Sequence, residues 1–238
     1  MSDISYNAGT MTVTVAGLDD VRRALGDLGK KTPAAAKVAI NATAREARKL
    51  MVAQAKARYA VNTAGKRHLK DLVQRKKATN HSLSAELHIR SFRNDLAYFQ
   101  HRPTTPFSGR SVALAPSYFR GHVLKGTPMQ KLKGGTNEAG LHVSKGFLVH
   151  FKSGHIGMVQ RIIGSRSDST VTARGYPRWR NKQGNVEKLV TMGSPSATAM
   201  HRTIWPYVEP SVEDYLQERL TLQVEKVLER AANKKVNG

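Results

Sequence analysis

Three histidines are the closest approach in this sequence to a set of residues that could hold a metal ion. His142, His150 and His155 are eight and five residues apart, a spacing that fits no usual ligand pattern, and no group of carboxylates lies near them. The chain has no cysteine, so thiolate ligands, iron–sulfur clusters and thiol nucleophiles are excluded. The sequence therefore predicts neither a metal site nor a cofactor.

Acidic residues are too scattered for a nuclease or another enzyme that works with paired carboxylates. Residues 101–210 hold only four of them, at positions 138, 168, 187 and 209, whereas metal-dependent nuclease chemistry needs carboxylates that converge on the same ions. The patterns G-x-x-x-x-G-K-[ST], H-E-x-x-H and G-x-S-x-G are missing as well. We therefore expect no catalytic residues. A nuclease stays a third hypothesis, which a divalent-cation-dependent activity would support.

Positive charge is the strongest signal in the sequence. Thirty-nine Lys and Arg residues stand against 17 Asp and Glu, a formal net charge of +22. Such a charge favours contact with a polyanion or with an acidic protein surface, and a solvated basic face that binds nothing is the simpler alternative. Residues 37–77 have a net charge of +10. The first candidate contact residues come from this stretch: Lys66, Arg67, Lys70, Arg75, Lys76 and Lys77.

A second candidate segment is Arg174-Gly-Tyr-Pro-Arg-Trp-Arg180, in which Arg174, Arg178 and Arg180 alternate with aromatic residues. Such a segment can stack on nucleobases and neutralise phosphates. The alternative, which we favour, is a loop whose Tyr176 and Trp179 pack against a neighbouring subunit. No helix-turn-helix, zinc-finger or RNA-binding sheet motif is present, so we expect no reading of a base sequence.

The N-terminal half reads as a strand at 11–15, a short helix at 18–28 and a long helix from 32 to about 59. Thr32 followed by proline predicts the start of the long helix, with the threonine hydroxyl as its N-cap. Ile40, Ala44, Ala47 and Met51 recur at helical spacing and form one apolar stripe. Because its members are mostly small, a neighbouring helix or subunit can approach closely, so these four residues are candidates for packing between subunits.

The rest of the chain adds a basic helix at 67–77, a strand at 83–89, a β-hairpin at 147–163, a strand at 203–205 and a helix from 211 to about 232. Phe147 and Val149 of the hairpin are further candidates for packing between subunits. The predicted fold class is α+β, with N-terminal helices, an antiparallel sheet with long loop insertions, and a C-terminal helix packed on the sheet.

We predict a single domain over residues 1–238. Its core covers about 11–93, 147–163 and 200–232, and its loop insertions cover about 94–146 and 164–199. No apolar run is long enough to span a membrane, and the first residues lack the features of a signal peptide. Together with the absence of cysteine, this predicts assembly in a reducing cytoplasm.

Three stretches carry a resemblance to a known family. They are Gly17-Leu18 followed by Ala39-Ile-Asn-Ala-Thr-Ala44, the hairpin Phe147-Leu-Val-His-Phe-Lys-Ser-Gly-His-Ile-Gly-Met-Val-Gln-Arg161, and the Pro-flanked strand at Ile204. Their order resembles the minor tail protein Z family of lambda-like long-tailed phages, within the wider group of tail-completion and head–tail joining proteins.

The resemblance implies a virion structural protein of the tail or neck, assembled in the host cytoplasm. It implies a homo-oligomeric ring, expected to be hexameric, at the head-proximal end of the tail. The implied partners are tail terminator, tail tube or connector proteins, and the genomic DNA end is a further candidate. The alternative from another class is a monomeric, nonspecific nucleic-acid-binding protein of nucleoid or ribosome type.

Overall fold

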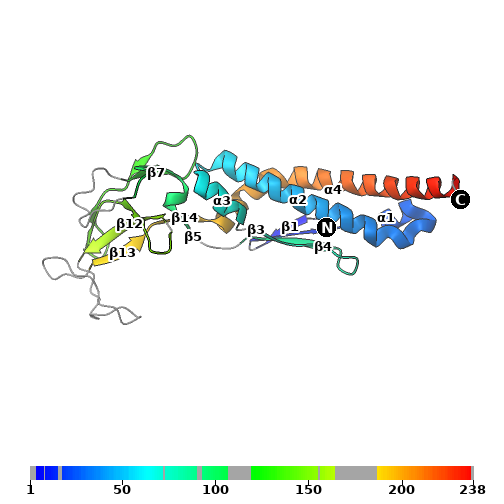
Figure 1. Cartoon of the computed structure of the whole chain (residues 1–238), viewed down its shortest axis with the longest axis horizontal. Helices are drawn as coiled ribbons and strands as arrows, with labels where there is room; N and C mark the ends of the chain where they lie inside the picture. Colours follow the sequence, from blue (N-terminus) through cyan, green and yellow to red (C-terminus); the bar gives the residue numbers. More distant parts are fainter. Residues whose placement is uncertain are drawn as a thin grey trace. The chain divides into compact units, whose positions relative to one another are not determined.

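The computed structural model describes residues 4–7, 9–15, 18–71, 73–89, 93–106, 119–154, 156–163 and 187–236. It confirms the predicted fold class, a mixture of helices and antiparallel sheets with a long C-terminal helix (Figure 1). The chain divides into two compact units. Unit 1 comprises Met1–Ala57, Arg67–Phe92 and Pro195–Gly238, and unit 2 comprises Arg58–Lys66 and Arg93–Ser194. This division does not test the predicted single domain, which stays a prediction.

Unit 1 contains a four-stranded antiparallel sheet in the order β1 (Ile4–Asn7), β2 (Thr10–Thr14), β4 (Ser84–Ile89), β3 (Val73–Lys76). Its strands alternate, as expected for a sheet with one covered face. Met11, Val13 and Leu87 are fully buried on the inner face. The outer face carries polar residues, such as Thr12 opposite Glu86. The predicted strands at 11–15 and 83–89 are therefore confirmed, each within one residue.

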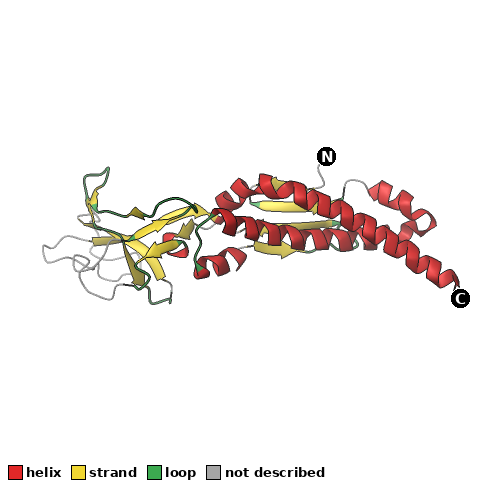
Figure 2. Cartoon of the chain, turned by 90° about the horizontal axis from the view of Figure 1, so that it is seen from above, coloured by secondary structure: helices red, strands yellow, loops and turns green. Residues whose placement is uncertain are grey.

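Helices cover the inner face of this sheet (Figures 1 and 2). They are α2 (Thr32–Arg58) and α4 (Ala197–Val236), which packs against α2. The helix α1 (Leu18–Leu25) and the 3-10 helix η1 (Gly26–Lys31) pack against α4. Small side chains let α2 pack closely within the unit. Ile40, Ala44, Ala47 and Met51 each have 0% of their surface exposed, so they have no surface left for another subunit.

Two predictions about helix ends in unit 1 are wrong. Helix α3 covers Thr63–Asp71, and the segment after it forms β3 instead of continuing the helix to 77. The reason is tertiary, because β4 offers a pairing partner in which Val73 lies opposite Ile89 and Lys76 opposite Glu86. Thr32 is also not an N-cap: it is itself helical, at φ −50° and ψ −48°, and its buried hydroxyl has no partner within the described residues.

The predicted strand at 203–205 is wrong, since α4 begins at Ala197 and contains both Pro206 and Pro210. The Ser196 hydroxyl caps this helix by accepting a hydrogen bond from the Ala199 N–H at 3.2 Å. Each proline lacks the N–H that would bond the carbonyl four residues earlier. Those carbonyls belong to Arg202 and Pro206, which are exposed like Pro210, so water can satisfy them. The buried side of the same segment holds Trp205, which stacks on Tyr6 with ring centroids 5.8 Å apart.

Unit 2 is built from short antiparallel strands. One sheet has the order β6 (Gln100–Arg102), β7 (Arg120–His122), β8 (Gln130–Lys131). A larger sheet contains β11 (Phe147–His150), β12 (Ile156–Ile163), β10 (His142–Val143) and β9 (Gly135–Thr136), with β13 (Glu187–Thr191) also on β12. Finally, β14 (Gly193–Ser196) pairs with β5 (Arg93–Asp95), which precedes the 3-10 helix η2 (Leu96–Tyr98).

The predicted hairpin is confirmed as β11 and β12, with Phe147 opposite Val159 and Leu148 opposite Met158. Gly154 has the positive φ (+81°) that its turn requires. The hairpin is held further by Gln160, whose side-chain amide donates to the carbonyls of Lys133 at 3.2 Å and Ser144 at 3.1 Å. Residues 94–146, which we predicted as a loop insertion, contain the short strands β6, β7, β8, β9 and β10. Among the described helices, none is long and apolar enough to cross a membrane.

Candidate functional site

The first group of predicted contact residues does not form one continuous surface within a single unit. Lys66 and Arg67 are both exposed on α3, but the boundary between the units falls between them. Lys77 is exposed beyond β3, and Lys76 forms an ion pair with Glu86 at 3.3 Å. The side chains of Lys70 and Arg75 lie outside the described part of the chain.

The start of α3 is fixed by Asn62, a residue that no sequence pattern singled out. Its side-chain oxygen accepts a hydrogen bond from the Gly65 N–H at 2.9 Å, the usual N-cap interaction. Its amide group donates to the carbonyls of Ala97 at 2.6 Å and Phe99 at 3.1 Å. Gly65 lies so close to Tyr98 that an added Cβ would be 2.1 Å from the Tyr98 carbonyl oxygen. Asn62 therefore positions both α3 and the segment that leads into β6.

The second group, Arg174, Arg178 and Arg180 together with Trp179, lies outside the described residues, so its predicted roles stay predictions. The hairpin residues proposed for packing are described. Phe147 is 5% exposed and forms a small apolar cluster with Val159, against which the half-buried Val149 packs. The guanidinium of Arg161 lies 5.9 Å from the centre of the Phe147 ring. This cluster is thus already covered in part by its own chain.

The positive charge is distributed unequally between the two units. The sequence ranges of unit 2 hold eighteen Lys and Arg against four Asp and Glu, a net charge of +14 in 111 residues. The ranges of unit 1 hold twenty-one against thirteen, a net charge of +8 in 127 residues. All three ion pairs between described residues, Arg23–Asp20, Lys49–Glu46 and Lys76–Glu86, belong to unit 1. The unbalanced charge is therefore concentrated in unit 2.

Two of the four acidic residues of unit 2, Asp95 and Glu138, have described side chains. Asp95 is 7% exposed, and its carboxylate accepts hydrogen bonds from the N–H groups of Ala97 at 2.8 Å and Met158 at 3.0 Å. Burial, and to a smaller extent the negative charge of Asp95, raises the pKa of the Tyr98 hydroxyl. Glu138 is exposed, and the side chains of the other two acidic residues are not among those described. Asp95 thus has a structural role, as the cap of η2 and a tie to β12.

The sheet β6–β7–β8 brings three of these cations into one row. Arg102 lies directly opposite Arg120 in the β6–β7 register, and Arg120 lies directly opposite Lys131 in the β7–β8 register. All three side chains are exposed. Directly opposite residues point to the same face of a sheet, and like charges in this position repel each other. We call these three residues the cationic row.

The adjacent register pair on the same face is Gln100 opposite His122. The Nε2 of His122 lies 3.1 Å from the Gln100 side-chain oxygen, and its Nδ1 lies 2.6 Å from the Thr127 carbonyl oxygen. An imidazolium ring can donate at both nitrogens. A neutral ring that donates to Thr127 needs the Gln100 amide turned, so that its NH2 group faces Nε2. In both cases the pair adds hydrogen-bonding groups beside the cationic row.

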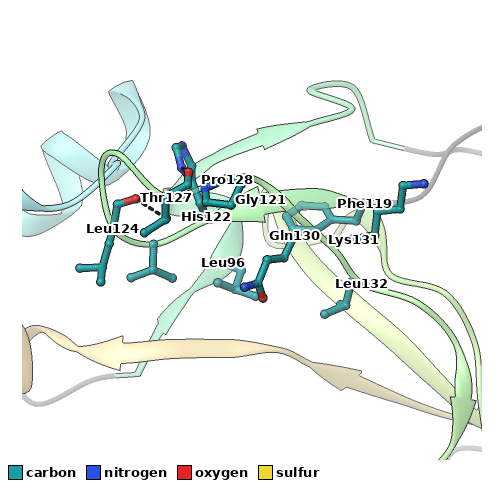
Figure 3. Close-up of a pocket in the computed structure, with 11 residues that line it drawn as sticks. Leu96, Phe119, Gly121, His122, Leu124, Thr127, Pro128, Gln130, Lys131 and Leu132 are labelled. Atoms are coloured by element: carbon teal, nitrogen blue, oxygen red, sulfur yellow. Dashed lines mark hydrogen bonds between the residues drawn. The ribbon is translucent and has the colours of Figure 1, made fainter.

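A cavity of about 340 Å³ lies beside β7 and β8 (Figure 3). Leu96, Phe119 and Leu132 contribute apolar side chains to its lining. The connection between β7 and β8 borders it, and the Thr127 hydroxyl donates to the Leu124 carbonyl there at 2.7 Å (Figure 3). Its lining residues lack a nucleophile–base pair and paired carboxylates, so this cavity gives no reason to propose a reaction.

The three histidines whose spacing came closest to a ligand set have separate places in the described chain. His142 belongs to β10 and His150 to β11, and His155 lies outside the described residues. Within the described part, no group of three or more His, Asp or Glu side chains could hold a metal ion.

Comparison with known proteins gives no relative from which a role could be transferred. No protein-family model matches the chain. No curated protein and no solved structure matches it either. The functional argument therefore depends on the charge distribution and the geometry described above.

Proposed function

We propose that the chain is a structural subunit of a long-tailed phage or prophage particle, a tail-completion protein at the head-proximal end of the tail. It acts as a homo-oligomeric ring, with six copies as the expected number, between tail tube or tail terminator and connector. Its role is to join surfaces, and it catalyses no reaction.

The observation that supports this proposal most strongly is the charge of unit 2. A net charge of +14, with Glu138 as the one exposed acid among its described side chains, repels itself unless a partner neutralises it. At a head–tail joint, two such partners are at hand, namely an acidic protein ring and the packaged DNA. The first two of the three stretches, Gly17-Leu18 with the helix at Ala39–Ala44 and the hairpin Phe147–Arg161, resemble tail-completion proteins and give the second support. The third stretch gives none, because Ile204 belongs to α4 and not to a strand.

The same charge also favours a second candidate, a monomeric protein that binds nucleic acid without sequence preference. The two candidates differ in assembly. Native mass spectrometry of nuclease-treated protein in high salt should give a multimer, expected to be a hexamer, if the first proposal is right. A monomer that binds DNA tightly would support the second candidate and remove the first.

The decisive experiment is genetic. Disruption of the gene in the phage or prophage that encodes it should yield filled heads and separate tails, which electron microscopy can count, and the gene supplied in trans should restore joined particles. Normal particles from the disrupted strain would contradict the proposal. The same assay can test the predicted contact residues. For this purpose Lys66 and Lys77 should be replaced by glutamine. A charge reversal in β3 is unsuitable, because a glutamate at position 76 would face Glu86 and disturb the strand pair.

A further inference from the structure

We infer that the cationic row Arg102–Arg120–Lys131 binds the phosphate backbone of nucleic acid and reads no base sequence. This inference goes beyond the proposed function, since it assigns a ligand class to three residues that no sequence pattern singled out. It holds under either candidate function.

The spacing of the row fits a chain of phosphates. Neighbouring strands are about 4.8 Å apart, so the Cα atoms of Arg102 and Lys131 are separated by about 10 Å across β7. One strand of duplex DNA carries a phosphate about every 3.4 Å along the axis. Three cations over this distance can therefore each meet a phosphate. Guanidinium groups suit this task, because two parallel N–H groups can donate to one phosphate.

The groups beside the row are of the kind that contact phosphates. Side-chain amides and protonated or N–H-bearing rings donate to phosphate oxygens in the same way as Lys and Arg, and such contacts fix position without reading bases. Gln100 can supply such a group one register pair away on the same face, whereas both ring nitrogens of His122 already lie within hydrogen-bond distance of the Gln100 side-chain oxygen and the Thr127 carbonyl, so His122 positions the Gln100 amide. The same unit has further exposed cations, among them Lys125, Lys133 and Lys152, which add to its net positive charge.

An acidic protein surface is a poorer match for the row. The centre of a protein–protein interface is depleted in charged residues and carries apolar or aromatic anchors. The row and its neighbouring pair contain no such anchor. The exposed apolar residues nearest in sequence, Leu124 and Met129, belong to the connection between β7 and β8 and not to the paired positions. A long polyanion needs only repeated positive charge, which this face has.

When no ligand is bound, the cationic row lowers the stability of the folded chain. Two like-charged pairs directly opposite each other oppose the pairing of the strands that carry them. Opposite charges or uncharged polar residues would serve the sheet better. A ligand that brings negative charge to this face offsets the repulsion between the three cations. Binding of an anion therefore explains why three like charges lie side by side here.

The test compares two triple variants with the same loss of charge. The first replaces the row, as Arg102→Gln, Arg120→Gln and Lys131→Gln. The matched control is Arg22→Gln, Lys30→Gln and Lys31→Gln, three exposed cations of α1 and η1 that lie close in sequence to Asp19, Asp20 and Asp27. Binding to two fluorescent 30-base-pair DNA duplexes of unrelated sequence is measured by anisotropy from 50 to 400 mM NaCl. Poly-glutamate is the competing ligand in a parallel series.

For each phosphate that the protein no longer neutralises, the slope of log K against log [salt] becomes shallower by about 0.9. The row variant should therefore show a slope shallower by about two to three and binding roughly 100-fold weaker at 100 mM NaCl, equally for both duplexes. The control variant should change the slope by less than about one. Circular dichroism and urea unfolding check that both variants keep the fold.

An unchanged slope in the row variant would overturn the inference. So would a variant that loses poly-glutamate binding but keeps DNA binding, because the row would then belong to an acidic protein partner. The proposed function fails separately. A row variant that forms rings and completes tails, with wild-type DNA binding, would keep the proposed function and remove this inference. A monomer with row-dependent DNA binding would do the reverse.

Discussion

Replacement of His201 by methionine should stabilise unit 1, most of all at acidic pH. His201 lies on the buried side of α4 and has 0% of its surface exposed. Neither ring nitrogen has a hydrogen-bond partner within the described part of the chain. Burial lowers the pKa of this ring from 6.5 to about 4. Methionine has a similar size, no strong hydrogen-bonding group and enough flexibility to fill the same space.

The gain at neutral pH follows from the two unpaired nitrogens. A buried polar atom without a partner costs about 1–3 kcal/mol. A volume-conserving replacement in a core costs less than about 1.5 kcal/mol in packing. With both nitrogens at the lower end of that range, the free energy of unfolding at pH 8 should rise by about 1 kcal/mol.

The gain at acidic pH follows from proton binding. Well above pH 6.5, as at pH 8, the ring is neutral in both the folded and the unfolded chain, so His201 adds no pH dependence there. As the pH falls from 6.5 to about 4, the unfolded chain takes up a proton that the folded chain does not. The free energy of unfolding therefore falls by about 1.4 kcal/mol per pH unit, about 3 kcal/mol in total. The methionine variant lacks this loss.

Urea unfolding at several pH values between 8 and 4.5 measures the difference. A Trp179→Phe background leaves Trp205 as the fluorescent reporter, buried in the same helix. Carboxylates titrate over the same range in both proteins, so the relevant quantity is the difference between wild type and variant. His81→Gln is the control, because it removes an exposed histidine of the same unit. The difference in the free energy of unfolding between wild type and this control variant should be close to zero. Parallel loss of stability in wild type and His201→Met would refute the reasoning.

Three further predictions concern unit 2. Gly65→Ala should destabilise it by about 2 kcal/mol in urea unfolding, because the new Cβ would collide with the Tyr98 carbonyl, whereas Gly135→Ala meets nothing within 4 Å and should have little effect. Asn62→Ala should cost about 2 kcal/mol through the lost cap and the lost donor to the Ala97 carbonyl, while Asn62→Asp, which keeps the cap but turns a carboxylate oxygen toward the Ala97 and Phe99 carbonyl oxygens, should cost at least as much. Arg120→Gln should raise stability by about 0.5 kcal/mol in 20 mM salt, and this gain should vanish in 1 M NaCl if repulsion within the cationic row is its cause.

Local patterns in the sequence were sufficient wherever periodicity and burial agree. The alternation at 83–89 predicts β4, and the stripe from Ile40 to Met51 predicts the buried side of α2. The hairpin at 147–163 also follows from two apolar runs around a turn with glycine. In each of these segments the spacing of the apolar residues already shows which side of the helix or strand is buried.

Prediction from the sequence fails where contacts with residues far away in the chain determine the secondary structure. Residues 73–76 have no apolar alternation and continue a basic helical pattern, yet β4 recruits them as an edge strand. Pro206 and Pro210 indicate helix breaks, yet the buried side of the same segment, including Trp205 against Tyr6, holds α4 continuous through both. Packing of the apolar side outweighs the two missing backbone hydrogen bonds, because the freed carbonyls face water.

The cationic row could not be found from the sequence, because its members are 18 and 11 residues apart and only the strand register makes them neighbours. The same limitation affected the ranking of charged segments. A window over residues 37–77 has a net charge of +10, but much of that window folds into unit 1, together with the acidic residues of α4 at positions 209, 213, 214, 218, 225 and 229. No comparable set of acids folds into unit 2, whose sequence ranges hold four. Whether a basic segment remains unbalanced thus depends on which acids the fold brings into the same unit, and unit 2 rather than the α3–β3 segment is where a polyanion finds the larger excess of charge.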